Sequence, residues 1–195
     1  MNHYFNKNIN LETDEKDIYF KISEKPFHFL TDNGVFSKAG LDFGSRLLLE
    51  TVKDISGKKV LDLGCGYGPI GIVYKTYNPQ IELTMSDVNE RALGLAKKNA
   101  KANGVEATII ASEGYENINE SFDLIISNPP VRAGKQLLQD LLTESATHLT
   151  DDGRLIFVIH KQLGGESAKK FCQGIYSKVD TINKKAGYMI IQCIK

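Results

Sequence analysis

Short apolar runs alternate with amphipathic stretches along most of the chain, and this alternation predicts an α/β fold with strands joined by helical crossovers. The runs that we expect to form strands cover residues 60–63, 81–85, 107–111, 122–127, 154–159, 178–182 and 188–194. Stretches with helical spacing lie between them at residues 91–100, 136–149 and 165–176, and Asp151-Asp152-Gly153 is expected to be a turn. The last two runs are expected to form a closing strand pair.

Residues 1–55 have a different pattern, which predicts an extension that precedes the alternating part. Residues 17–22 and 26–31 read as two short strands of a hairpin, and residues 42–54 read as a helix. The apolar face of that helix is expected to contain Phe43, Leu47, Leu48 and Val52. Core packing is the favoured interpretation for Phe36 and Phe43. The alternative is that residues 34–45 cover a bound ligand or a target base.

The stretch from Lys59 to Gly71 predicts a buried strand, a glycine turn and the start of a helix. Gly64, Gly66 and Gly68 permit positive φ angles and close approach of a ligand to the backbone. Pro69 suits the first helical turn, where its missing N–H costs nothing. A strand that leads into such a loop is typical of a nucleotide cradle, in which backbone N–H groups face the ligand.

The spacing of the glycines distinguishes between cofactors. A dinucleotide site needs G-x-G-x-x-G, whereas this stretch reads D-x-G-x-G-x-G, and Asp62 would repel a pyrophosphate. A nicotinamide oxidoreductase is therefore disfavoured, and the carboxylate suits a ligand with a cationic end. Packing glycines in an ordinary strand–turn–helix unit are the alternative. The run V-L-D-L-G-C-G-Y-G resembles the first motif of class I S-adenosylmethionine methyltransferases.

That resemblance implies roles for residues along the edge of the sheet. It places Asp62 near the amino-acid part of S-adenosylmethionine, with Gly64, Cys65 and Gly66 making room for the cofactor. Asp87 follows the glycine loop by about 20 residues, where an acid can bind both ribose hydroxyls, and Val88 lies beside it; an N-cap role for Asp87 is compatible with this. Glu113 is a candidate for the adenine amino group or, equally, a solvated loop acid.

The stretch Asn128-Pro129-Pro130 ends the fourth strand and is the candidate catalytic motif. It resembles the N-P-P-aromatic tetrad of enzymes that methylate amino groups. The exocyclic amine of a base is a weak nucleophile because its lone pair is delocalised into the ring. The Asn128 side-chain oxygen and the Pro129 carbonyl can each accept one N–H, which aims the lone pair at the methyl group. They also stabilise the positive charge that develops on nitrogen. A proline-rich strand exit without chemistry is the alternative.

The residues after this motif concern the substrate. Val131 stands where an aromatic residue would stack on the target, so stacking would come from elsewhere, such as Phe36, or the base would be held by apolar contact. Arg132 and Lys135 are candidates for phosphate contacts, and surface charges at a helix start are the alternative.

The resemblance can be narrowed with the upstream residues. G-V-F-S at residues 34–37, L-D-x-G-S-x-L-L at residues 41–48 and N-P-P-V-R-A-G-K at residues 128–135 are similar to the small-domain family related to the 16S ribosomal RNA guanine-N2 methyltransferases. The resemblance implies a Rossmann-like seven-stranded class I methyltransferase sheet with the last strand antiparallel. The length of 195 residues predicts a single domain over residues 1–195, with an extension at residues 1–55 that covers the site and a cofactor-binding core at residues 56–195. The expected reaction is methyl transfer from S-adenosylmethionine to guanine N2 in ribosomal RNA.

Two other functions stay open from the sequence. The first is methylation of a protein glutamine or of adenine in nucleic acid, in which the N-P-P tetrad usually ends with Tyr or Phe rather than a residue like Val131. The second is a module that binds cofactor and RNA without catalysis, for example in ribosome assembly; the intact Asn128-Pro129-Pro130 motif disfavours it.

Composition adds three expectations. The 24 basic and 24 acidic residues give a net charge of zero, so ribosomal RNA or the small ribosomal subunit would have to be attracted by a local patch. Cys65, Cys172 and Cys193 lack metal-ligand spacing, so no metal is expected, and their odd number predicts reduced thiols in a cytoplasmic protein. Residues 1–10 lack the apolar core of a signal peptide, and no run is long enough to cross a membrane.

Overall fold

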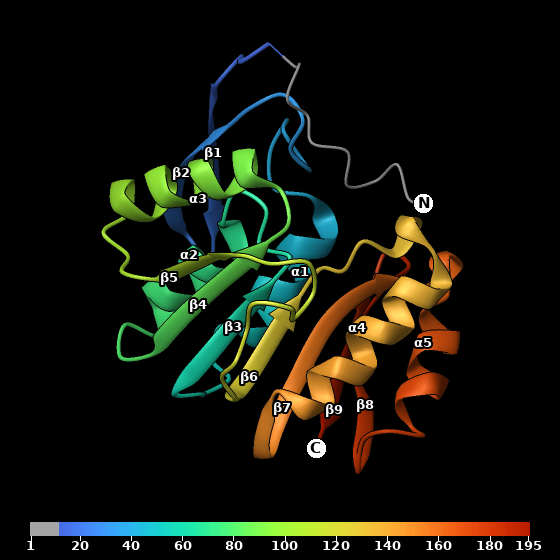
Figure 1. Ribbon diagram of the computed structural model, residues 1–195. Coiled ribbons are helices and arrows are strands. Elements are labelled where there is room, and N and C mark those ends of the chain that lie inside the picture. Colours follow the sequence, from blue (N-terminus) through green and yellow to red (C-terminus); the bar gives the residue numbers. More distant parts are fainter. Residues whose placement is uncertain (1–11) are drawn as a thin grey trace.

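A seven-stranded sheet forms the centre of the computed structural model, which describes residues 12–195 (Figure 1). The strand order is β5-β4-β3-β6-β7-β9-β8. The strands are β3 (Lys59–Leu63), β4 (Glu82–Asp87), β5 (Thr108–Ala111), β6 (Phe122–Ser127), β7 (Leu149–His160), β8 (Lys178–Lys185) and β9 (Tyr188–Ile194). The first five strands in the order run parallel, and β9 is antiparallel to both of its neighbours. The expected Rossmann-like sheet with an antiparallel last strand is confirmed.

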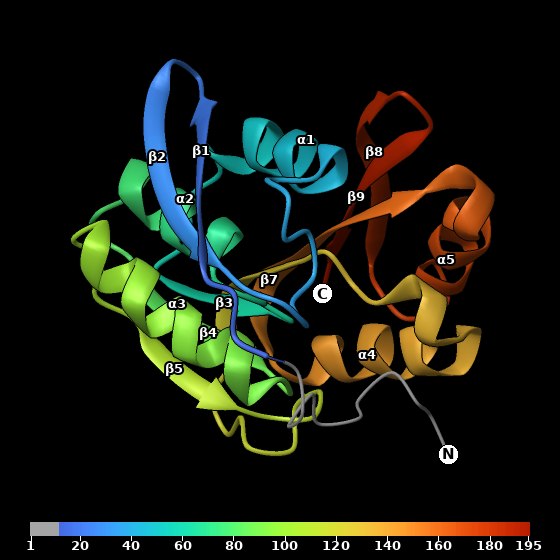
Figure 2. The ribbon, with the colours of Figure 1, turned by 90° about the horizontal axis from the view of Figure 1, so that it is seen from above.

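Helices cover both faces of the sheet, because its strands are apolar on both sides. On one face lie α1 (Phe43–Val52), α2 (Pro69–Tyr77) and α3 (Glu90–Ala102), whose apolar side chains share one core cluster with the hairpin. On the other face lie α4 (Lys135–Thr147) and α5 (Gly165–Cys172), which pack into a second cluster. Figure 2 shows α1 and α4 on opposite sides of the strands. Short 3-10 helices cover Val131–Ala133 and Lys161–Leu163.

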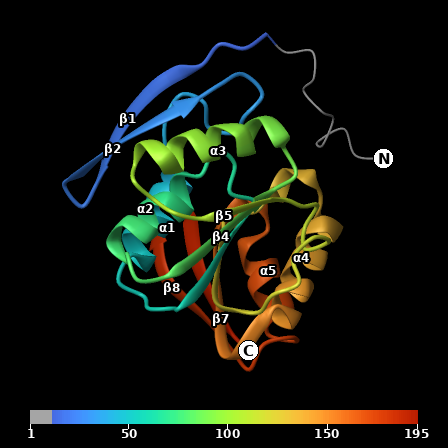
Figure 3. The same ribbon diagram turned by 60° about the vertical axis from the view of Figure 1, so that its left-hand side comes forward.

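The extension begins with a β-hairpin made of β1 (Lys16–Ile22) and β2 (Lys25–Thr31), as the sequence predicts. The two strands are joined by a tight turn at Ser23 and Glu24, which both have positive φ angles. The hairpin lies along α3 (Figure 3). Asn99 of α3 is fully buried there, and its side chain bonds the backbone N–H and C=O of Leu30 at 2.7 and 2.9 Å. The same amide donates to the Tyr67 carbonyl at 2.9 Å and so connects the hairpin to the glycine loop.

The structure corrects three expectations. Phe36 and Phe43 are 68% and 40% exposed, so neither is a core residue. Phe43 is the first residue of α1 and its ring lies beside Tyr188 of β9, whereas Leu47, Leu48 and Val52 are buried as expected. Residues 151–153 are not a separate turn but belong to β7, where Asp152 has a φ of 59° and the pairing with β6 is irregular.

Three further expectations concern a signal peptide, membrane-spanning segments and the cysteines. The absence of a signal-like segment was expected for residues 1–10, which lie outside the described residues. Within residues 12–195, no helix is both long and apolar enough to span a bilayer. The side chains of Cys65, Cys172 and Cys193 are free thiols, and all three are buried.

Candidate active site

Three polar residues predicted from the sequence lie at the same edge of the sheet. Asp62 is near the end of β3, Asp87 ends β4, and Asn128 directly follows β6. These strands are parallel neighbours, so their carboxyl ends bring the three side chains to one edge. That edge is where ligands bind in open α/β sheets.

The glycine loop is held against the end of β4. The Gly64 and Cys65 N–H groups both donate to the Ser86 carbonyl, at 2.8 and 2.9 Å, and Gly66 N–H donates to Asp87 Oδ2 at 2.8 Å. Gly64 and Gly66 have φ angles of 72° and 56°, and a Cβ atom on either would meet nothing within 4 Å. The backbone therefore borders open space, which is the kind of surface that a closely bound ligand requires.

Asp62 is an almost fully buried carboxylate with one unpaired oxygen. Its Oδ2 accepts from Gly71 N–H at 2.7 Å, whereas Oδ1 is buried without a hydrogen-bond partner. Burial raises the pKa of Asp62 to about 7, with a smaller contribution from the nearby Asp87 charge, and the hydrogen bond from Gly71 opposes the rise. An unpaired buried carboxylate oxygen suits a cationic donor such as the ammonium group of S-adenosylmethionine. The residues present therefore fit that cofactor.

Asp87 is half-buried, and its carboxylate connects the end of β4 with the glycine loop and the start of α3. Its Oδ1 accepts from Asn89 N–H at 2.8 Å, while Oδ2 holds Gly66. Burial raises the pKa of Asp87, and these backbone hydrogen bonds oppose that rise. The N-cap of α3 is Asn89 rather than Asp87, and the Asn89 side chain also donates to the Gly34 carbonyl at 3.0 Å. This contact places the start of residues 34–45 beside the end of β4. Val88 is half-buried.

Asn128 is fixed by a residue of the extension. Its Nδ2 donates to Ser45 Oγ at 3.0 Å, and Ser45 is buried. Ser45 N–H in turn donates to Asp42 Oδ1 at 3.1 Å, which caps α1. With the amino end of the Asn128 amide occupied, its oxygen remains to accept a hydrogen bond.

The prolines shape the chain after Asn128. The Pro129 carbonyl accepts from Val131 N–H at 2.8 Å, and the Pro130 carbonyl accepts from Ala133 N–H at 2.9 Å. A carbonyl oxygen has two lone pairs, so Pro129 keeps one acceptor position. Just before them, Ser127 Oγ donates to the Leu63 carbonyl at 2.8 Å, which joins the ends of β3 and β6.

The other residues that the sequence predicts for the site lie further apart from one another. Val131 packs against the second core cluster, while Arg132 and Lys135 are exposed, with Lys135 beginning α4. Glu113 is exposed, and its neighbour Ser112 donates its N–H to the Asp87 carbonyl at 3.0 Å. The segment that carries Glu113 therefore starts beside the end of β4.

Sequence reasoning missed two features of this edge. Ser45 was identified only as the end of the covering segment, and its contact with Asn128 spans 83 positions. The ring of Tyr188, at the start of β9, lies 5.5 Å from the Phe43 ring and 4.8 Å from the His160 ring. The only sequence signal for Ser45 is its spacing from Asp42, which fits an N-cap pair.

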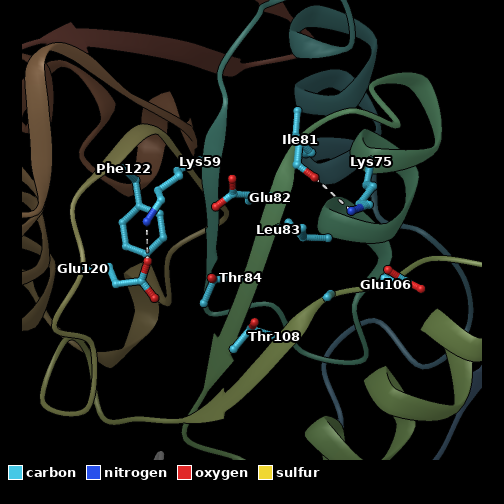
Figure 4. Close-up of a pocket in the computed structure, with 11 residues that line it drawn as sticks. Lys59, Lys75, Ile81, Glu82, Leu83, Thr84, Glu106, Thr108, Glu120 and Phe122 are labelled. Carbon is cyan, nitrogen blue, oxygen red and sulfur yellow. Dashed lines mark hydrogen bonds and ion pairs between the residues drawn. The ribbon is translucent and has the colours of Figure 1, made fainter.

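A cavity of about 410 Å³ lies at the opposite edge of the sheet, where β3, β4, β5 and β6 begin (Figure 4). Lys59 at its wall forms an ion pair with Glu120 at 2.8 Å, and Lys75 Nζ donates to the Ile81 carbonyl at 2.9 Å. Its cations are thus already engaged, and it lies at the amino ends of the strands. The candidate site stays at the carboxyl ends.

Comparison with known proteins agrees with this placement. The family model described as "Methyltransferase small domain" matches residues 26–192. Among curated proteins, the uncharacterized protein YbxB of Bacillus subtilis is 37% identical, with 99% of this chain and 98% of that protein covered. The ribosomal RNA small subunit methyltransferase C of Erwinia tasmaniensis is 42% identical over 64% of this chain. The alignment covers 38% of that enzyme, so this chain spans less than half of its length.

A solved structure extends the comparison to the fold. The Thermus thermophilus 16S rRNA N2 G1207 methyltransferase RsmC, solved with AdoMet and guanosine, superposes with a TM-score of 0.85 at 24% identity. The superposition covers 95% of this chain and 52% of that one. A ribosomal protein L11 methylase from Lactobacillus delbrueckii superposes with a TM-score of 0.72 at 18% identity. At these identities the structures establish the shared fold.

Proposed function

Since this chain belongs to the methyltransferase small domain family and is an S-adenosylmethionine-dependent methyltransferase, we propose that it methylates N2 of guanine in 16S-type ribosomal RNA. Its substrate would be ribosomal RNA or the small ribosomal subunit, and its site of action the cytoplasm. Support for this substrate comes from the RsmC relatives, whose names give small-subunit ribosomal RNA as their target.

The cofactor supplies an electrophilic methyl group on a sulfonium sulfur. In the proposal, the unpaired oxygen of Asp62 accepts from its ammonium group, and the Gly64–Gly66 backbone borders its amino-acid part. Asp87 accepts from the ribose hydroxyls beside Val88, with Glu113 toward the adenine amino group. The support for these assignments is the open space over the glycines and the buried, unpaired Asp62 oxygen.

Asn128 and Pro129 bind the target amine in this proposal. The Asn128 oxygen and the Pro129 carbonyl each accept one N–H of the amine, which turns the nitrogen lone pair toward the methyl group. Pro130 fixes the backbone that presents these acceptors. The same two oxygens stabilise the charge that develops on nitrogen, and the methylated nitrogen then loses a proton to solvent. A strong general base is unnecessary, because that proton becomes acidic after transfer.

Ser45 acts as a positioning residue for Asn128. An amide with its ends exchanged would point an NH2 group at the substrate amine, so donor would face donor. In the structure Ser45 accepts from Nδ2, which holds the Asn128 side chain in place and leaves its oxygen free. On the substrate side, Phe36 and Val131 would give apolar contacts, and the exposed Arg132 and Lys135 would contact phosphates.

The observation that carries the proposal is the Asn128 amide, fixed by Ser45 at the carboxyl end of a central strand and next to the glycine loop. The test supplies methyl-labelled S-adenosylmethionine and purified protein with deproteinised ribosomal RNA, small subunits, large subunits or a protein extract. The labelled product is then digested and identified. We expect label in N2-methylguanosine.

Two outcomes would replace the proposal. Label in glutamine or in N6-methyladenosine would show that the N-P-P motif serves another amine. No label in any sample, with cofactor binding retained, would support a module that binds cofactor and RNA without catalysis. A parallel reaction with Asn128→Ala protein identifies label that does not depend on the proposed site.

A further inference from the structure

Three aromatic side chains meet at the carboxyl edge of the sheet. Phe43 is the first residue of α1, His160 ends β7, and Tyr188 begins β9 opposite His160. The Phe43 and Tyr188 ring centroids are 5.5 Å apart with 37° between the ring planes. The His160 ring meets Tyr188 edge-on at 4.8 Å and 84°. The cluster thus consists of two tilted rings supported by a third.

Glycines allow these rings to lie directly on the backbone. A Cβ atom on Gly44 would lie 3.0 Å from Tyr188 Cε1, and one on Gly187 would lie 2.5 Å from His160 Nε2. Gly44 is inside the first turn of α1, where glycine is unfavourable for the helix itself. Its presence is therefore explained by the close packing of the Tyr188 ring.

The cluster is next to the proposed catalytic asparagine. Ser45, two residues after Phe43 in α1, accepts the hydrogen bond from Asn128. In the sheet, Ser127 at the end of β6 pairs with Phe157, and β7 continues three residues further to His160. Two separate elements, α1 and β7, thus bring the rings to the side of the Asn-Pro-Pro segment.

Phe43 differs from the other apolar residues of its helix. It is 40% exposed, whereas Leu47, Leu48 and Val52 are buried at 3% or less. Its ring is therefore partly open to solvent at the edge where the site lies and can be contacted by a ligand. Val131, which follows Asn-Pro-Pro, is aliphatic and packs against the second core cluster. The motif itself therefore supplies no aromatic surface for a base.

We propose that Phe43 and Tyr188 form the platform on which the target guanine stacks while its amine faces Asn128. This inference rests on the proposed function, because it takes a purine base as the substrate. Every base has a π-face, and stacking on aromatic side chains is a recurring mode of RNA binding. His160 supports the platform through Tyr188.

The test measures guanosine binding separately from methyl transfer. Free guanosine is titrated into protein saturated with S-adenosylhomocysteine, which prevents reaction, and the dissociation constant is read from chemical shifts. Phe43→Leu keeps apolar volume but removes the π-face. We expect the dissociation constant for guanosine to increase about tenfold. Phe43→Tyr should bind like wild type. Tyr19→Leu is the matched control, because Tyr19 is 75% exposed on the hairpin.

The outcomes distinguish this inference from the proposed function. Guanosine binding that depends on Phe43, without N2-methylguanosine in the labelling experiment, would keep the platform and reject the reaction. Guanine methylation with guanosine affinity unchanged in Phe43→Leu would keep the reaction and reject the platform. Absence of guanosine binding to wild type, or a loss in Phe36→Leu instead, would also overturn the platform. Equal melting temperatures and equal cofactor affinity confirm that each variant is folded.

Discussion

The side-chain amide of Asn128 donates to the hydroxyl oxygen of Ser45 at 3.0 Å, although 83 positions separate the two residues. This contact joins the extension to the candidate catalytic motif. The extension therefore does more than cover the site, since it holds the Asn128 side chain by a hydrogen bond.

Removing the Ser45 hydroxyl should reduce turnover without affecting the cofactor. In Ser45→Ala, the Asn128 side chain loses the hydrogen bond that holds it in place, so we expect kcat to fall about tenfold, the size of one hydrogen bond. KM for S-adenosylmethionine should stay constant, and Ser45→Thr should restore kcat. Thr51→Ala, which removes a hydroxyl from the same helix, is the control. An unchanged kcat in Ser45→Ala would show that Asn128 needs no positioning.

Asn128→Ala should remove the acceptor for the target amine. We expect kcat to fall by about 100-fold or more, the range for losing a group that stabilises developing charge. Cofactor affinity, measured by calorimetry, should be nearly unchanged. In the double variant with Ser45→Ala, the second substitution should add almost nothing, because both act through one group. Full activity in Asn128→Ala would exclude the mechanism.

Asp62 should make stability depend on pH. Its pKa is raised in the folded protein to about 7, so the native state binds the proton more tightly than the unfolded chain between pH 4 and 7. The free energy of unfolding should therefore fall as pH rises through this window, by up to about 4 kcal/mol for a three-unit shift. Urea unfolding at pH 4 and pH 8 should show a larger decrease in wild type than in Asp62→Asn, and the difference between the two proteins is the contribution of Asp62.

The same carboxyl should couple cofactor binding to proton release. An ammonium group next to Asp62 favours the ionised form, so binding at pH 6.5 should release up to about one proton. Calorimetry in two buffers of different ionisation enthalpy measures that number. Asp62→Asn should release none and bind more weakly. Equal proton release by wild type and Asp62→Asn would show that Asp62 does not contact the cofactor.

Asp87 is expected to contribute to cofactor affinity in two ways. Its carboxylate holds the Gly66 and Asn89 N–H groups and, in the proposal, the ribose hydroxyls. Asp87→Ala should weaken S-adenosylmethionine binding about 100-fold, because charge-assisted hydrogen bonds are lost. Glu113→Ala, which removes an exposed acid nearby, should have a much smaller effect. Unchanged affinity in Asp87→Ala would contradict the ribose assignment.

Asn99 should be important for stability rather than for catalysis. Its buried amide satisfies both backbone groups of Leu30 and the Tyr67 carbonyl. Asn99→Leu leaves these groups unpaired, and we expect a loss of about 2–4 kcal/mol in the free energy of unfolding. Asn103→Ala, which removes a hydrogen bond to His28 at the same interface, should cost about 1 kcal/mol. A similar loss of unfolding free energy in both variants would show that Asn99 contributes no more to stability than Asn103.

The sequence predicts most of the sheet because its strands are defined by local pattern. The buried runs at β3, β4 and β6 and the hairpin with its short turn are visible in apolar periodicity and turn residues. Asp151–Gly153 have the residue types of a turn, but they continue β7 as an irregular stretch between Leu149, which pairs with Phe122, and Arg154, which pairs with Leu124.

Features of the site that depend on distant segments could not be predicted in this way. Exposure of Phe43 depends on where the first turn of α1 ends relative to the sheet, which periodicity does not specify. The Ser45–Asn128 contact and the Tyr188 cluster require the extension, β6 and β9 to be placed together in three dimensions. Asp62 and Asp87 could be predicted from the sequence because each lies at the end of its own strand.

The buried amide of Asn99 also has a consequence for the order of folding. Its bonds to Leu30 close a loop of 69 residues, which costs about 4 kcal/mol of chain entropy before any contact compensates it. Such closure is favourable only after α3 and the glycine loop have formed the surface that receives the hairpin. We therefore expect docking of the hairpin to be a late step, after which the glycine loop has all of its anchoring contacts. Competence to bind the cofactor would then mark the end of folding.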